Sequence, residues 1–467
     1  MRRSRLLLLA ALFASRTAGF AQAPPPARPN VVVVLADDLG YGDLSAYGSP
    51  NAHTPHLDRL AAEGARLTDA YAFPTCSPSR AALLTGRYPP AVGIPLVVGP
   101  VGPPWTRDRQ FGLDPAATTT LAEVLRDAGY ATAIVGKWHL GHFPETLPTE
   151  HGFDRYYGIP YSNDMLAPGY PPLALLRARA GEPADTVAVE PRQDTLTAAY
   201  HRAALAFVAE AAAAEAPFFL YLAHHLPHVP LHGEAAFAET ARTPLAAAVE
   251  EVDAGVGRLL AALDGLGIAD ETLVVFASDN GPWLAYGDHA GSAGPFRAGK
   301  ATSFEGGTRV PMLWRWPGVI PAGRIAHDRA SLLDVLPTAA AWAGAPAPAD
   351  LPGRDLRPVL TGRGTPAAEP PFFYWFEGRV EAVRRGRHKL HLPHGYRVVA
   401  RQGLGGEWGR YGRDSIGVAL FDLVADPGER YDRSAEYPAL VTELRALAEA
   451  HEREVLADAT PAWRPEE

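Results

Sequence analysis

Apolar runs of strand length alternate along the chain with stretches whose apolar residues recur at helical spacing. The run 30–36 (NVVVVLA) is continuous and β-branched, which is typical of a strand buried on both faces of a parallel sheet. Further strand-like runs cover residues 130–135, 218–223, 272–277 and 310–314, and helical patterns cover residues 54–64, 120–128, 196–214, 244–263 and 331–343. This alternation predicts βαβ units in an α/β, doubly wound sheet.

A second pattern begins after residues 361–371, which are rich in Gly, Pro and Ala and predict a linker. Strand-like runs follow at 372–376, 382–392 and 419–423, and a final helix is expected over 438–452. We therefore predict a large domain over residues 22–365 and a smaller C-terminal α+β subdomain over residues 366–467.

The first residues have the pattern of a signal peptide over residues 1–21. Arg2, Arg3 and Arg5 precede the apolar stretch 6–13, and small residues follow at 19–23. Cleavage is expected after Ala21, with Ala23 as the alternative. The apolar stretch is too short to span a bilayer, and we expect no transmembrane segment elsewhere. The chain is thus expected to be periplasmic or secreted.

The net charge of −9 argues against a nucleic-acid partner, because no basic stripe is available to bind phosphates. The one short basic run, RRGRHK at 384–389, is expected to be a solvated face. The chain has a single cysteine, which excludes an internal disulfide. A lone thiol in an exported protein needs either a buried packing role or a chemical use.

Two of the predicted buried strands are followed by polar residues. Asp37 and Asp38 follow the run 30–36, and Asp279 and Asn280 follow the run 272–277. Either pair alone is typical of a turn, but parallel strands bring their carboxyl ends to one edge of a sheet. Three carboxylates and one amide suit Ca²⁺ or Mg²⁺. Zinc normally recruits histidine or thiolate, and neither pair has a histidine adjacent.

The cysteine, Cys76, begins the sequence CSPSR, which ends at Arg80. Residues 81–85 have a helical pattern, so Cys76 is expected near a helix N-terminus, where backbone N–H groups favour an anion. Arg80 can bind an anionic group or a metal ligand. An activated thiolate nucleophile is one chemistry consistent with these residues.

The expected strand 130–135 runs into the sequence GKWHLG. Lys137 and His139 are two residues apart, so in an extended segment they point to one side and Trp138 points to the other. Trp138 is expected to pack in the core. A cation beside an imidazole suits an oxyanion and a proton transfer.

Two further candidates follow later strands. Among the histidines after the run 218–223 we favour His228, between two prolines, and expect structural roles for His224 and His225. Lys300 lies in a glycine-containing loop, where an exposed lysine is the ordinary expectation.

Taken together, these motifs resemble the sulfatase family, in its formylglycine-dependent, arylsulfatase A-like branch with bacterial members. The matching pieces are VVVVLADDLGYGDL, CSPSRAALLTGR, GKWHLG, HHLPHVP, SDNGP and GKATSFEGGTRVP. The resemblance implies an alkaline-phosphatase-like α/β fold with a mixed sheet. It also implies that a separate maturation enzyme, the formylglycine-generating enzyme, oxidises Cys76 to formylglycine (3-oxoalanine).

The resemblance further assigns roles to single residues. It implies one Ca²⁺, with Mg²⁺ possible, held by Asp37, Asp38, Asp279, Asn280 and residue 76. The remaining site residues that it implies are Arg80, Lys137, His139, His228, Lys300 and the sulfate-contacting Ser162. The implied substrate is a sulfate ester of an aryl group or a carbohydrate. A hydrated aldehyde attacks sulfur with help from Asp279, His228 protonates the leaving alcohol, and His139 helps to release sulfate.

Two alternatives stay open. A phosphate- or phosphonate-ester hydrolase of the same fold could use the same formylglycine, and a non-catalytic protein could bind sulfated glycans. Substrate selectivity is expected from loops at residues 94–111, 161–179 and 394–408, where Trp105, Tyr170 and Tyr396 could stack on a ring.

Overall fold

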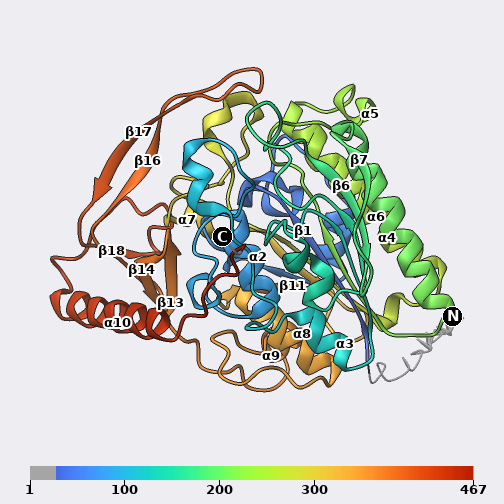
Figure 1. Cartoon of the computed structure of the whole chain (residues 1–467). Helices are drawn as coiled ribbons and strands as arrows, with labels where there is room; N and C mark the ends of the chain where they lie inside the picture. The colour runs from blue at the N-terminus through green and yellow to red at the C-terminus, as the bar shows by residue number, and fades with distance from the viewer. Residues whose placement is uncertain (1–27, 466–467) are drawn as a thin grey trace, which may run out of the picture.

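The computed structural model describes residues 28–465, so the predicted signal peptide lies outside the described residues. A ten-stranded mixed sheet, in the order β11-β2-β10-β9-β1-β8-β4-β5-β6-β7, forms the centre of the protein (Figure 1). Its strands are β1 (Asn30–Ala36), β2 (Ala65–Leu67), β4 (Ala131–Gly136), β5 (Arg155–Gly158), β6 (Ala174–Arg179), β7 (Asp185–Val189), β8 (Phe218–Ala223), β9 (Thr272–Ser278), β10 (Met312–Arg315) and β11 (Arg324–Ala326). Strands β9, β1, β8, β4 and β5 run parallel, whereas β10 and β6 pair antiparallel with their neighbours.

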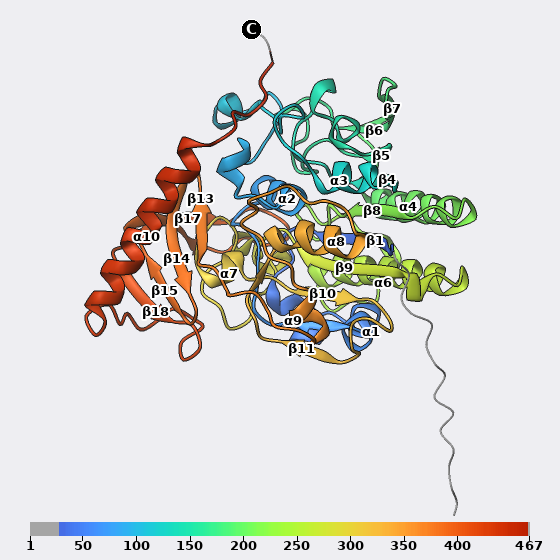
Figure 2. The same cartoon turned by 90° about the horizontal axis from the view of Figure 1, so that it is seen from below.

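Helices cover both faces of this sheet, as the alternation of strands and helices predicts. One face of β1, with Val32 and Val34, packs against α1 (Pro55–Ala62), α4 (Leu196–Ala213) and α6 (Pro244–Gly265). The other face, with Val31 and Val33, packs against α2 (Cys76–Thr85), α3 (Leu121–Asp127) and α8 (Val335–Ala343). Helices α4 and α6 lie side by side in Figure 2. The doubly wound α/β architecture is confirmed. No helix among residues 28–465 has the length and apolar character needed to cross a bilayer.

A smaller antiparallel sheet lies beside the first and is covered by the long C-terminal helix (Figure 2). It contains β13 (Phe372–Phe376), β14 (Arg379–Arg385), β15 (His388–His391) and β18 (Ala419–Asp422), and the helix is α10 (Pro438–Ala457). The run 382–392, expected as one strand, is a hairpin that turns at Gly386 with φ of 57°. An apolar cluster joins this sheet to Tyr71, Phe73 and Tyr88 of the large domain. The domain boundary after residue 365 stays a prediction.

A two-stranded ribbon, β16 (His394–Arg401) and β17 (Arg410–Ile416), occupies a region expected to be a loop. The turn of the ribbon contacts the 3-10 helix η9 (Leu284–His289), where the N–H groups of Gly403 and Gly409 donate to the Ala285 carbonyl at 2.9 and 3.0 Å. The ribbon has few buried side chains, so its sequence lacks the alternation that marks a strand. This contact brings the C-terminal part of the chain to the edge of the large sheet.

The basic run 384–389 is not simply a solvated face, as the sequence led us to expect. Arg384 is buried and pairs with Asp69 at 2.6 Å. Lys389 is fully buried and pairs with Glu305 at 3.1 Å and with Glu429 at 2.9 Å. Residue 305 belongs to the large domain, so these cations connect the two sheets. The expectation fails because charge in a sequence does not reveal a buried partner distant along the chain.

Candidate active site

The carboxyl ends of β1 and β9 bring four predicted metal ligands together. The two strands are paired, with Ala36 opposite Ser278, and each continues into its polar residues. The Asp38 N–H donates to Asp279 Oδ1 at 3.1 Å, and Asn280 Nδ2 donates to Asp38 Oδ1 at 2.7 Å. Asp37, Asp38, Asp279 and Asn280 are all buried. The shared edge that the parallel pattern predicts is therefore present.

Cys76 faces these carboxylates from the first residue of α2, which begins earlier than the expected helix 81–85. Its Sγ lies 3.4 Å from Asp37 Oδ1, 3.9 Å from Asp38 Oδ1 and 3.4 Å from Lys300 Nζ. Burial and the charges of Asp279 and Asp37 raise the pKa of the Cys76 thiol well above its ordinary value. The unmodified side chain is thus a neutral thiol, which does not support an activated thiolate.

The Arg80 guanidinium binds the carboxylates of Asp37 and Asp279 and fixes their positions. It donates to Asp279 Oδ2 at 2.9 and 3.1 Å, to Asp37 Oδ2 at 3.2 Å and to the Lys137 carbonyl at 2.7 Å. The side chain is fully buried. Arg80 was expected to bind an anionic group or a metal ligand. The structure shows it bound to two predicted metal ligands, Asp37 and Asp279.

Lys137, His139 and Ser162 meet at the ends of β4 and β5. Lys137 Nζ donates to Asp37 Oδ2 and, at 3.0 Å, to Ser162 Oγ. His139 adopts φ of 62°, so the segment turns here and is not extended as expected. Its two buried ring nitrogens have no hydrogen-bond partner among residues 28–465. Burial and the charges of Lys137 and Arg80 hold the pKa of His139 well below its ordinary value, so the ring is neutral.

Trp138, between them, is fully buried, and its Nε1 donates to the Thr146 carbonyl at 2.8 Å. Its predicted role in the core is confirmed. His224 and His225 are also buried, and burial lowers their pKa values to about 3. His224 Nε2 lies 3.4 Å from His201 Nε2, away from the carboxylates. Both are consistent with the structural role expected of them.

His228 and Lys300 approach Asp38 from the other side of Cys76. His228 Nδ1 donates to the Val229 carbonyl at 2.5 Å, so Nε2, 3.6 Å from Asp38 Oδ2, is directed to the carboxylates. Burial and the charge of Lys300 lower the pKa of His228. Lys300 Nζ lies 2.6 Å from Asp38 Oδ1 and 4.6 Å from the centre of the Trp283 ring. Lys300 is therefore not an exposed loop lysine.

The donor set fits a divalent cation. Oxygen, sulfur and nitrogen ligand atoms of Asp37, Asp38, Cys76 and His228 all lie within 4.8 Å of one another. The buried Oδ1 of Asn280 has no hydrogen-bond partner among residues 28–465. Burial and the charge of Asp37 raise the pKa of Asp279 to about 7, because the ionised carboxylate loses its hydration and is repelled by its neighbour. A bound cation would offset both effects. Neither Asp pair has a histidine adjacent in the sequence, but the fold brings His228 Nε2 to 3.6 Å from Asp38 Oδ2.

A cavity of about 550 Å³ opens over these residues. It is lined by Cys76, His139, Ser162, His228 and Lys300, and by residues from the three loops expected to set selectivity, namely Leu96 and Arg109, Met165 and Tyr170, and Arg397 and Trp408. Tyr396 does not line it and packs on Phe304, with ring centres 4.9 Å apart. The side chain of Trp105 lies outside the described part of the structure.

Among the residues of this cavity that the motifs did not single out are Asp164, Trp283 and Tyr286. Two of them follow motifs that could have pointed to them. Asp164 is two residues after Ser162, and Trp283 directly follows SDNGP. Their closeness in the sequence to predicted site residues could have indicated that they line the same cavity.

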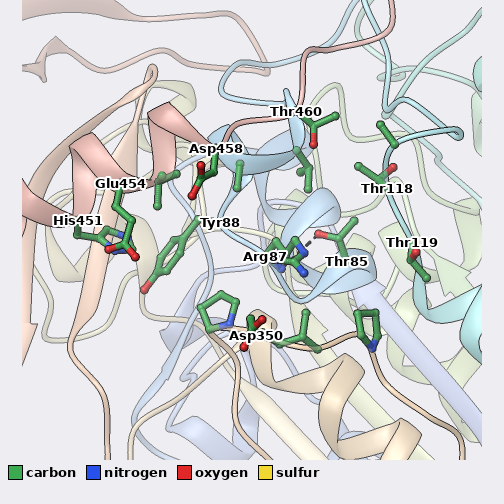
Figure 3. A pocket seen from close by; sticks show the side chains of 17 residues that line it. Thr85, Arg87, Tyr88, Thr118, Thr119, Asp350, His451, Glu454, Asp458 and Thr460 are labelled. Carbon is green, nitrogen blue, oxygen red and sulfur yellow. Dashed lines mark hydrogen bonds between the residues drawn. The ribbon is translucent and has the colours of Figure 1, made fainter.

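A second cavity, of about 640 Å³, contains none of the predicted site residues. In Figure 3 His451 and Glu454 of α10, with Asp458 directly after the helix, line one part of it, and Thr118 and Thr119 line another. Its size does not make it the better candidate, because it lacks the buried carboxylates, lysines and cysteine that converge in the first cavity.

Comparison with known proteins agrees with this geometry. The family model described as Sulfatase matches residues 29–345, and the model described as N-sulphoglucosamine sulphohydrolase, C-terminal, matches residues 298–451. Arylsulfatase A of Homo sapiens is 41% identical over 462 residues, which span 92% of this chain and 86% of that protein. N-acetylgalactosamine-6-sulfatase of Homo sapiens is 37% identical over 471 residues, with 95% and 88% covered.

Among solved structures, PsFucS1 sulfatase from Pseudoalteromonas sp. superimposes with a TM-score of 0.82. It is 27% identical, and the match covers 93% of this chain and 92% of that one. Family model, relatives and fold all coincide with the convergence of carboxylates, cysteine and lysines at one edge of the sheet. The chain belongs to the sulfatase family and is a sulfuric ester hydrolase.

Proposed function

We propose that the protein hydrolyses sulfate monoesters through formylglycine made from Cys76, with one Ca²⁺ as its cation and Mg²⁺ as the alternative. The observation that carries this proposal is the position of Cys76 at the start of α2, in contact with Asp37, Asp38 and Lys300. Asp37, Asp38, Asp279 and Asn280 supply oxygen ligands, which suit a hard cation, and residue 76 completes the set.

A cation held by these ligands would polarise the sulfate ester, and a hydrated formylglycine at residue 76 would supply one hydroxyl for attack on sulfur and a second whose deprotonation would release sulfate. The proton of the attacking hydroxyl would go to Asp279, whose charge acts on residue 76, since burial and this charge raise the pKa of the Cys76 thiol. Lys300 and Ser162 line the cavity and would hold the sulfate oxygens, and Lys137 supports them from behind Ser162, to whose Oγ its Nζ donates at 3.0 Å.

Two histidines divide the remaining proton transfers. His228 directs Nε2 toward the carboxylates and lines the cavity together with Lys300, so we assign the protonation of the leaving oxygen to His228 in its protonated form, with Lys300 as the second candidate donor. His139 has two ring nitrogens without partners among the described residues, and it takes the proton of the second hydroxyl. Arg80 acts as a positioning residue, because its guanidinium donates to the ligand carboxylates Asp37 and Asp279 and to the Lys137 carbonyl.

The burial of Cys76 supports a maturation step before folding. Its side chain is 2% exposed, so a formylglycine-generating enzyme could not reach it in the folded protein. We propose that the chain is modified while unfolded and then exported to the periplasm or beyond, as the expected signal peptide indicates.

The deciding experiment is mass spectrometry of the tryptic peptide 67–80, from protein made together with a formylglycine-generating enzyme. Conversion removes one sulfur and two hydrogens from residue 76 and adds one oxygen. We expect this change, together with hydrolysis of 4-nitrophenyl sulfate that is lost in Cys76→Ala. An intact thiol in active protein would contradict the proposal.

The same preparation separates the two alternatives. Faster hydrolysis of 4-nitrophenyl phosphate or a phosphonate monoester than of the sulfate would favour the phosphorus-ester hydrolase. Binding of sulfated glycans without turnover of any ester, by protein with a converted residue 76, would favour the non-catalytic binder.

A further inference from the structure

Beside His228 the active-site cavity holds a carboxylate that the proposed mechanism does not use. Asp164 lines the cavity, and its buried Oδ1 has no hydrogen-bond partner within residues 28–465. A buried acceptor without a donor is unfavourable, so such groups usually have a partner in the functional state. The proposed catalytic residues already account for the sulfate group, which leaves Asp164 available to the rest of the substrate.

Two neighbouring tyrosines locate this carboxylate in the space where the leaving group must lie. Burial and the charge of Asp164 raise the pKa of Tyr170 to about 12 and also raise that of Tyr286. Tyr170, Tyr286 and His228 all line the same cavity. A group that leaves from sulfur toward His228 therefore enters a cavity that Asp164 also lines, and the charge of Asp164 acts on His228.

An aromatic wall leads outward from the same position. The Trp283 ring centre lies 5.5 Å from that of His228 and 5.9 Å from that of Trp408. Trp408 is 55% exposed, so the wall extends from the proton donor to solvent. Flat indole rings offer an apolar surface to the C–H face of a sugar ring as well as to an aryl ring.

The charges that line the cavity decide between these two ligands. Arg109 and Arg397 line the cavity together with Glu377 and Asp164, so donors and acceptors are mixed there. Arg109 lies 3.8 Å from Glu377. A simple aryl or steroid group uses neither donors nor acceptors, and a purely basic lining would suit a polyanion. A polyhydroxylated ring uses both kinds of group.

We infer that Asp164 selects sulfated carbohydrates, with its carboxylate accepting hydrogen bonds from hydroxyl groups of the leaving sugar while the ring packs on Trp283. The inference rests on the proposed sulfatase function and names the substrate class of that same site.

The test compares full-length, formylglycine-containing enzyme with three variants. Asp164→Leu removes the acceptor, Asp164→Asn keeps one carbonyl oxygen, and Glu145→Leu replaces an exposed acid outside the cavity as a control. Each is assayed on monosulfated hexoses and on 4-nitrophenyl sulfate. We expect Asp164→Leu to lower the ratio of kcat/KM for the best hexose sulfate to that for the aryl sulfate by about tenfold to a hundredfold, mainly through KM. The ratio for Asp164→Asn should lie between those of wild type and Asp164→Leu, and Glu145→Leu should leave the ratio unchanged.

Calorimetric titration of the same hexose sulfate into Cys76→Ala, with and without Asp164→Leu, gives a second readout that needs no turnover. Binding weakened by a similar factor in the double variant supports the inference, and circular dichroism checks that each variant is folded. Equal ratios in wild type and Asp164→Leu would overturn it. Wild-type enzyme that hydrolyses 4-nitrophenyl sulfate but no hexose sulfate would overturn it as well, while the sulfatase proposal stands. Failure on every sulfate ester, with residue 76 converted, would overturn both.

Discussion

The crowding of carboxylates around Cys76 is the residue-scale feature that most constrains the chemistry. Asp37, Asp38 and Asp279 lie together at full burial, and Arg80, Lys137 and Lys300 offset their charge. The buried Asn280 Oδ1 is left without a donor among residues 28–465. Carboxylates and an amide oxygen arranged in this way are preorganised for a cation, and their mutual repulsion makes the cation-free protein less stable.

We therefore expect Ca²⁺ to raise the thermal midpoint of the protein, as measured by differential scanning calorimetry against a sample in EDTA. Binding to the folded state alone adds about 2.7 kcal/mol when free Ca²⁺ is a hundred times the dissociation constant. The increase should disappear in Asn280→Ala and persist in Glu210→Gln, whose acid is exposed and distant. A thermal midpoint that neither Ca²⁺ nor Mg²⁺ changes would argue against the metal site.

At the scale of an element, the basic run on the hairpin β14–β15 contains both a buried and an exposed cation. Lys389 is fully buried between Glu305 and Glu429, whereas Arg385, in the same run, is 39% exposed and pairs with Glu443. Removing one member of a buried ion pair leaves an uncompensated charge, but a surface pair is screened by water and salt.

Lys389→Met should consequently lower the free energy of unfolding by about 3–5 kcal/mol. Arg385→Met, the matched control on the same hairpin, should lower it by no more than about 1 kcal/mol. Urea denaturation followed by tryptophan fluorescence measures both. Equal losses in the two variants would show that the buried cluster does not connect the sheets as the structure indicates.

At the scale of the whole molecule, the C-terminal sheet is joined to the large domain in three ways. The apolar cluster around Tyr71 and Phe73 crosses the boundary, the charged cluster around Lys389 does the same, and the ribbon β16–β17 contacts η9 through Ala285. The ribbon also brings Arg397 and Trp408 to the catalytic cavity. The C-terminal part therefore contributes side chains to the lining of the cavity.

This sharing of buried residues predicts one cooperative thermal transition for the protein without added metal. The calorimetric and van't Hoff enthalpies should agree, because neither part can expose its side of the boundary while the other stays folded. Two resolved transitions, or a van't Hoff enthalpy well below the calorimetric one, would show that the parts unfold separately.

Local patterns in the sequence were sufficient for the five central strands of the large sheet, β10, β9, β1, β8 and β4, and for the positions of its metal-ligand candidates, but not for the five outer strands. Runs such as 30–36 and 218–223 are hydrophobic throughout because both faces of a central parallel strand are covered, and this buried state is visible residue by residue. Asp37 and Asp279 could be placed at one edge because parallel strands share their direction.

Contacts between distant segments could not be inferred in this way. The ribbon β16–β17 is exposed on both faces, so its hydrogen-bond pairing leaves no apolar pattern in the sequence. The burial of Lys389, the approach of His228 to Asp38 and the position of Asp164 in the cavity each depend on partners far along the chain. Such environments are decided by tertiary packing, because burial and charge pairing are properties of the folded surroundings and not of the residue.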